Sequence, residues 1–169
     1  MGGGVGISCH GSHRVVCESS QIAMPECGIG LVPDVGGSLL LARAPGRLGE
    51  YLGLTTARMG PADAIYAGFA DAYIPQSKWA NLISQLCEQG DVSAVDAAAQ
   101  KAPEGDLQAL QPMIDSHFGG ETLRDITNAL QSGGGDFAME ALKRLSRNSP
   151  LSMATAIEII HRLRGPTAD

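Results

Sequence analysis

Two carboxylates in the segment of residues 24–37, MPECGIGLVPDVGG, have the residue types and spacing for chemistry. Glu26 and Asp34 lie eight residues apart, and each directly follows a proline that restricts the backbone beside it. Glutamate and aspartate are rarely buried unless they are paired or functional. Upstream stands a run of glycines that expose backbone N–H groups: Gly2, Gly3 and Gly4. Carboxylates beside bare amides indicate acid/base or nucleophilic chemistry at a polarised carbonyl.

Each of these residues also has a purely structural interpretation. Glu26 fits a surface glutamate in a Pro-Glu turn, and the glycine triplet fits a flexible terminal segment. Asp34 stands two residues before Gly36, where it is placed to cap a following helix. The spacing by itself leaves both interpretations of each residue open.

The histidines and cysteines give weaker signals. His10 and His13 are three residues apart, but no further ligands follow at a useful spacing, so structural roles are favoured over a metal site. The cysteines lack C-x-x-C spacing and a disulfide pattern, which indicates reduced and mostly buried thiols that serve packing: Cys9, Cys17, Cys27 and Cys87. Reduced thiols favour the cytoplasm, or the mitochondrial matrix in a eukaryote.

Composition excludes several classes of protein. The chain has 169 residues, of which 44% are hydrophobic and 18% are charged, as in a globular protein with a substantial core. The net charge of -6 argues against nucleic-acid binding, which requires a basic face. No apolar run approaches the length of a membrane span, so no membrane partner is expected.

The pattern of apolar residues and breakers predicts an α/β part over residues 1–90 and an all-helical region over residues 91–169. Strands are expected at residues 14–17, 21–24 and 69–74. Helices are expected at residues 5–13, 36–43, 47–54, 61–67, 78–88, 107–117 (broken or kinked at Pro112), 121–131, 136–147 (capped by Asp136) and 150–163 (capped by Ser149).

Three segments carry a resemblance to a known family. MGGGVGISCHGSHRV, the MPE..IGLVPDVGG segment and TTARMGPADAIYAGFADAYIP resemble the enoyl-CoA hydratase/isomerase (crotonase) superfamily. The resemblance covers nearly the whole chain and implies a partial crotonase spiral of short strands and helices, followed by the helical region. It is closer to the 3-hydroxyisobutyryl-CoA hydrolase branch, which has glycine at the position of Gly6 and aspartate at that of Asp34. FAMEALKRLSRNSPLSMA is also similar to that branch.

The resemblance assigns roles to the residues of the first paragraph. Gly3, between Gly2 and Gly4, would donate its N–H to the thioester oxygen. Glu26 would attack the thioester carbonyl or activate a water molecule. Asp34 would hydrogen-bond the 3-hydroxyl of the substrate. No metal or redox cofactor is implied, because coenzyme A arrives as part of the acyl-CoA substrate.

The function implied in this way is hydrolysis of 3-hydroxyisobutyryl-CoA to 3-hydroxyisobutyrate and CoA in valine breakdown. The alternative within the family is an enoyl-CoA hydratase or isomerase, against which Gly6 argues, because hydratases use a glutamate there. Family members begin well upstream and continue beyond the end of this chain, so we expect the middle and late portion of a longer protein. A catalytically inert, self-associating scaffold is the alternative of another class.

Overall fold

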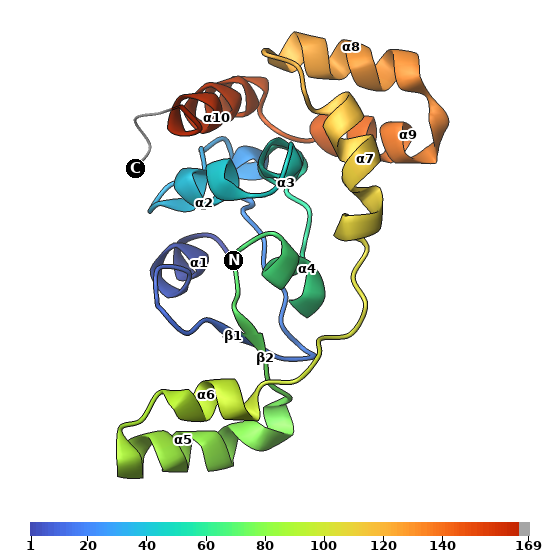
Figure 1. The fold of residues 1–169 in the computed structure, drawn as a ribbon. Helices are drawn as coiled ribbons and strands as arrows, with labels where there is room; N and C mark the ends of the chain where they lie inside the picture. The colour runs from blue at the N-terminus through green and yellow to red at the C-terminus, as the bar shows by residue number, and fades with distance from the viewer. Residues whose placement is uncertain (166–169) are drawn as a thin grey trace.

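Ten α-helices and one two-stranded parallel sheet make up residues 1–165, the part of the chain that the computed structural model describes (Figure 1). The first part of the chain contributes α1 (Gly3–Ser8), β1 (Val15–Val16), the 3-10 helix η1 (Glu26–Ile29), α2 (Gly37–Arg43), α3 (Leu48–Thr55), α4 (Pro61–Tyr66) and β2 (Ala72–Tyr73). The second part contributes η2 (Gln76–Lys78), α5 (Trp79–Gln89), α6 (Ser93–Ala98), α7 (Leu107–His117), α8 (Leu123–Gly133), α9 (Gly135–Leu145) and α10 (Pro150–Leu163).

The sheet joins two of the three expected strands. Val15 pairs with Ala72 in parallel register, so β1 and β2 lie side by side although η1, α2, α3 and α4 lie between them in the sequence. The expected strand at residues 21–24 is wrong, because this segment makes only an isolated antiparallel bridge between Ile22 and Met59.

Proline, glycine and hydroxyl side chains set most helix ends. Pro150 is the first residue of α10, and the Ser149 side chain accepts from the N–H of Ser152 at 3.3 Å, as predicted. Asp136 does not cap α9, because that helix begins one residue earlier after Gly134, a glycine at φ 64°. Of the break or kink expected at Pro112, the break is wrong, because α7 continues through this residue.

One buried cluster joins the two parts of the chain. Leu41, Leu52 and Ile160 pack where α2, α3 and α10 meet (Figure 1). A Cβ on Gly49 would lie 2.0 Å from the carbonyl oxygen of Leu41, so the close approach of α3 to α2 requires glycine here. A second cluster joins Ile74 to Leu82 of α5 and Val95 of α6. The division of the chain near residue 90 stays a prediction.

A buried ion-pair network fixes α10 on α3. Glu50 is fully buried, and its carboxylate accepts from Arg164 at 2.5 and 2.8 Å and from Arg47 at 3.1 Å. His161 lies 3.1 Å from the same carboxylate. The other end of α10 contacts η1, because the N–H of Ser149 donates to the carbonyl of Cys27 at 2.9 Å. The helical region therefore supports the short helix that carries Glu26.

Candidate functional site

Glu26 is a buried carboxylate at the first position of η1. The residue is only 4% exposed, and its Oε2 has no hydrogen-bond partner within residues 1–165. Its Oε1 lies 3.4 Å from the position that a Cβ on Gly2 would take. Burial raises the pKa of Glu26, and the nearby carboxylate of Asp34 raises it further. The structure therefore holds a carboxyl group of raised pKa beside the start of α1.

Contacts of its backbone keep η1 in place. The carbonyl of Glu26 accepts from the N–H of Leu31 at 3.0 Å, and Gly30 ends the helix at φ 81°, which glycine adopts without strain. On another side of η1, a Cβ on Gly28 would lie 3.2 Å from Oδ1 of Asn148. These contacts, with the bond from Ser149 to Cys27, restrict the direction of the Glu26 side chain.

The glycine triplet forms the start of α1. Gly2 precedes the helix at φ 58° and donates its N–H to the carbonyl of Ala23 at 3.3 Å. Gly3 and Gly4 make up the first helical turn, and their N–H groups find no acceptor in the described part of the chain. No atom lies within 4 Å of the position of a Cβ on either residue. The helix thus begins earlier than predicted and presents free N–H groups beside Glu26.

Asp34 is exposed and lies near Glu26, as its effect on the pKa of Glu26 shows. The helix α2 begins at Gly37 after Gly36, and no side chain caps it. The interpretation of Asp34 as a helix cap is therefore wrong. Its carboxylate accepts no hydrogen bond from residues 1–165, so it remains available to a ligand.

Packing between α1 and the turn after Asp34 was not visible in the sequence. Val35 adopts φ 47°, an unusual conformation for a β-branched residue. A Cβ on Gly6 would lie 2.6 Å from Cβ of Val35 and 2.9 Å from its carbonyl oxygen. The same carbonyl lies 3.1 Å from Nε2 of His10. His10 and the absence of a side chain at Gly6 thus fix the turn that carries Asp34.

His13 and the cysteines lie outside the group formed by Glu26, Asp34 and the start of α1. His13 lies 2.8 Å from the hydroxyl of Ser12, and within the described residues no group of histidine, cysteine and carboxylate side chains is placed to hold a metal. Cys9, Cys17 and Cys27 are buried free thiols, whereas Cys87 is exposed. Burial raises the pKa of Cys27 to about 11, so this thiol stays protonated near neutral pH.

Comparison with known proteins gives the family. A sequence model described as enoyl-CoA hydratase/isomerase matches residues 1–168. The chain belongs to the enoyl-CoA hydratase/isomerase family. The predicted superfamily is thereby confirmed.

Two relatives of the chain are named as 3-hydroxyisobutyryl-CoA hydrolases. The chain is 38% identical to the mitochondrial 3-hydroxyisobutyryl-CoA hydrolase of Rattus norvegicus, with 90% of the chain and 43% of that protein aligned. It is 35% identical to a probable 3-hydroxyisobutyryl-CoA hydrolase of Arabidopsis thaliana, over 98% of the chain and 47% of that protein. The chain spans less than half of the length of these two relatives.

Solved structures confirm the partial crotonase fold. An enoyl-CoA hydratase from Rhodobacter sphaeroides superposes on 100% of the chain with a TM-score of 0.92 and 56% identity, and 48% of that protein is covered. A carnitinyl-CoA dehydratase from Mycobacterium thermoresistibile superposes on 97% of the chain with the same TM-score and 41% identity, again with 48% covered.

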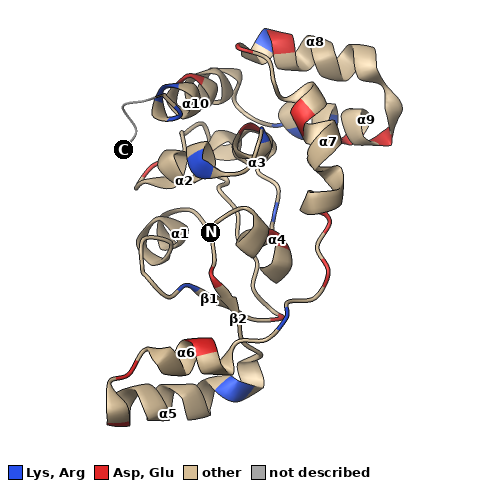
Figure 2. Cartoon of the chain, in the orientation of Figure 1, with Lys and Arg blue, Asp and Glu red and all other residues tan. Residues whose placement is uncertain are grey.

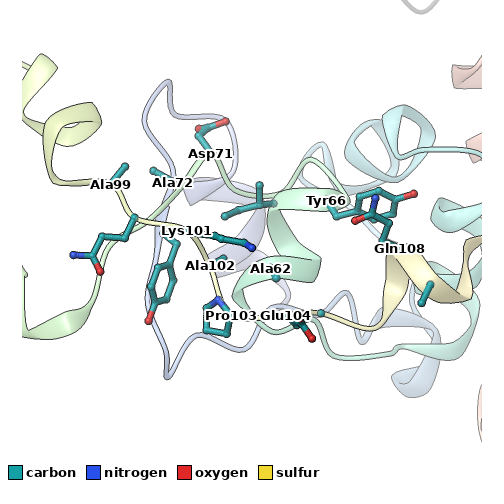
Figure 3. Close-up of a pocket in the computed structure, with 15 residues that line it drawn as sticks. Ala62, Tyr66, Asp71, Ala72, Ala99, Lys101, Ala102, Pro103, Glu104 and Gln108 are labelled. Carbon is teal, nitrogen blue, oxygen red and sulfur yellow. The ribbon is translucent and has the colours of Figure 1, made fainter.

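A cavity of 810 Å³ lies away from the predicted site, between α4, β2 and the segment that leads into α7 (Figure 3). Its lining includes Tyr66, Asp71, Lys101 and Gln108, and none of the glycines and carboxylates predicted from the sequence. The candidate site of this family member is instead the exposed start of α1 beside η1. No helix within residues 1–165 has the length and apolar character to cross a membrane.

Proposed function

We propose that this chain carries a CoA-thioester hydrolase site that cleaves 3-hydroxyisobutyryl-CoA to 3-hydroxyisobutyrate and CoA, a step of valine breakdown. The observation that carries the proposal is the buried carboxylate of Glu26, whose Oε2 has no partner within residues 1–165, beside the free N–H groups of α1. In the overall reaction, the water oxygen bonds to the carbonyl carbon, the C–S bond breaks, and the departing sulfur takes up a proton.

Glu26 is the reacting group in this proposal. A general base works best when its pKa lies near the working pH, and burial shifts the pKa of Glu26 upward in that direction. The carboxylate either removes a proton from the attacking water or attacks the carbonyl itself to form an anhydride that water then opens. Both routes require an oxygen free of protein partners, and Oε2 has none among residues 1–165.

The N–H of Gly3 stabilises the thioester oxygen as negative charge develops on it. Where a bound substrate excludes water from the site, one such donor contributes on the order of 3 kcal/mol to transition-state stabilisation. Gly2 and Gly4 flank this donor, and the space around Gly3 and Gly4 is open, so a carbonyl can approach the backbone closely.

Asp34 and Gly6 support a hydrolase over a hydratase. The exposed carboxylate of Asp34 is placed near Glu26, where it can accept a hydrogen bond from the 3-hydroxyl of the substrate. A glutamate in place of Gly6 would require the strained turn at Val35 to move, because even a Cβ would collide with it. The named 3-hydroxyisobutyryl-CoA hydrolases among the relatives support the same substrate.

An enoyl-CoA hydratase is the second candidate function. It is favoured by the Rhodobacter sphaeroides structure, which is described as an enoyl-CoA hydratase and is 56% identical to the chain. In that case water would add to a carbon–carbon double bond with Glu26 and Asp34 as the available carboxylates.

Product analysis of this chain separates the candidates. Incubation with 3-hydroxyisobutyryl-CoA is expected to release free thiol, measured with a thiol reagent, faster than crotonyl-CoA is hydrated under the same conditions. Faster hydration of crotonyl-CoA would favour the second candidate. The absence of both activities would support the catalytically inert scaffold. The inactive chain should then still show a cooperative melting transition.

Self-association and the compartment belong to the same proposal. Large apolar side chains remain exposed near the site and suit contact with another copy: Ile7, Ile29, Leu31 and Val35. Light scattering is expected to show an oligomer, and a monomer at micromolar concentration would contradict it. We place the protein in the cytoplasm, or in the mitochondrial matrix of a eukaryote. In this proposal the reaction needs coenzyme A only as part of the substrate.

A further inference from the structure

A second hollow, of 400 Å³, lies where the end of α3 meets the end of α9. Three arginines and one glutamate line it together with neutral polar residues: Thr55, Thr56, Arg58, Glu140, Arg144, Arg147 and Asn148. The lining is therefore positive in a chain whose net charge is -6. Figure 2 shows Lys and Arg scattered among Asp and Glu along the rest of the chain.

The arginines of this hollow are incompletely paired. Arg144 contacts Glu140 at 3.1 Å, and this contact lowers the pKa of Glu140. Arg58 and Arg147 make no side-chain hydrogen bond or ion pair with any residue of 1–165. One carboxylate thus faces three guanidinium groups, so the hollow carries a net positive charge that favours an anion.

Neutral groups in the same hollow are held in fixed positions. Thr56 adopts φ 53° and ψ 30° at the end of α3, a conformation that is uncommon outside glycine and is frequent at functional sites. Asn148 donates its side-chain amide to the carbonyl of Leu54 at 2.7 Å, which fixes the amide at the wall of the hollow. The hydroxyl of Thr56 makes no hydrogen bond within the described residues.

We propose that this hollow is a binding site for a phosphate group, held by Arg58 and Arg147 with help from Arg144 and the hydroxyl of Thr56. The guanidinium fork matches the oxygens of a phosphate in a bidentate manner, and a hydroxyl adds a neutral donor. The volume of 400 Å³ accommodates a phosphate or diphosphate with part of the molecule that carries it.

The site touches the segment that carries Glu26. A Cβ on Gly28 would lie 3.2 Å from Oδ1 of Asn148 and 4.0 Å from Cγ2 of Thr56, so the wall of the hollow packs on η1. Gly28 is two residues after Glu26, on a different side of a 3-10 helix. A bound phosphate would therefore stabilise the position of η1 without contact with the reacting carboxylate.

The phosphate can come from a CoA substrate or from a separate phosphorylated molecule. The first source rests on the proposed function, whereas the site itself does not. Binding of inorganic pyrophosphate to the purified chain tests the site without reference to thiol release, so failure of the hydrolase proposal and failure of the site are distinguishable.

Calorimetric titration with pyrophosphate at constant ionic strength compares three proteins. The double variant R58Q/R147Q is expected to bind about tenfold or more weakly than the wild type, because it loses two charge-assisted contacts. The matched control R124Q/R162Q removes the same charge elsewhere, from α8 and α10, and is expected to bind as the wild type does. Equal weakening in both variants, or no binding to the wild type, would overturn the proposal.

Two further measurements locate the site and identify the molecule that supplies the phosphate. In nitrogen–proton correlation spectra, pyrophosphate is expected to shift the amide signals of Thr56 and Gly28, and unchanged signals at both would overturn the site. Displacement of pyrophosphate by CoA but not by pantetheine would assign the phosphate to the substrate. Pyrophosphate binding that CoA leaves unchanged would support the site with a separate phosphorylated ligand.

Discussion

Replacement of Glu26 with glutamine is expected to stabilise the fold while it removes the reacting group. Glu26 is 4% exposed, and its Oε2 has no partner within residues 1–165. A buried polar atom without a partner costs about 1–3 kcal/mol, and a charged one costs more. Glutamine keeps the shape and removes the charge, although its amide also lacks partners. We therefore expect a net gain of about 1 kcal/mol at pH 7.

The pH dependence follows from the raised pKa of Glu26. In the unfolded chain a glutamate has a pKa of about 4.3. Between that pH and the raised pKa of the folded state, the folded chain binds more protons than the unfolded chain. The wild type therefore loses stability as pH rises through this window, and the advantage of Glu26→Gln grows there before it becomes constant above the folded pKa.

Urea denaturation of both proteins from pH 4 to pH 8 measures this difference. In thermal denaturation at pH 7, the melting temperature of Glu26→Gln is expected to be about 2–4 °C higher than that of the wild type. Glu104→Gln serves as a control, because Glu104 is exposed and its replacement is expected to change stability by less than about 0.5 kcal/mol. A destabilised Glu26→Gln, or a difference that is the same at pH 4 and pH 7, would refute the reasoning.

Three further substitutions test other contacts. Gly6→Ala is expected to lower the free energy of unfolding, measured in urea, by about 2 kcal/mol, because its Cβ would lie 2.6 Å from Cβ of Val35. A second substitution, Val35→Gly, is expected to recover part of this loss. Losses that simply add in the double variant would contradict the contact. Asp34→Ala is expected to change the free energy of unfolding by less than about 0.5 kcal/mol, because no helix cap is lost, and to slow thiol release. A clear drop in melting temperature would argue that Asp34 caps α2. Glu50→Ala is expected to cost about 3–5 kcal/mol by calorimetry, because Arg164 loses its buried partner; a change below about 1 kcal/mol would contradict this buried network.

Local signals in the sequence predicted most of the helices. Proline or a hydroxyl at the start and glycine at the end define α4 and α10 within one or two residues, because these residue types act on the backbone directly. The early start of α1 was missed, because glycine disfavours helix and only contacts such as that of Gly2 with Ala23 select the helix here.

The candidate site could be predicted in composition but not in geometry. Motif resemblance and spacing identified Glu26 and Asp34, and the structure places them close enough for one to raise the pKa of the other. The contact of Gly6 with Val35 depends on a positive φ at a valine, which propensity argues against. The pairing of residues 21–24 likewise depends on a partner far along the chain. Such tertiary contacts leave no local signal.

The rate of thiol release from 3-hydroxyisobutyryl-CoA by the wild type and by Glu26→Gln, both confirmed as folded, tests the central claim most directly. We expect the variant to be about 10²–10⁴-fold slower, because it lacks the group that activates water or attacks the carbonyl. Equal rates in the two folded proteins would show that Glu26 does not carry the reaction.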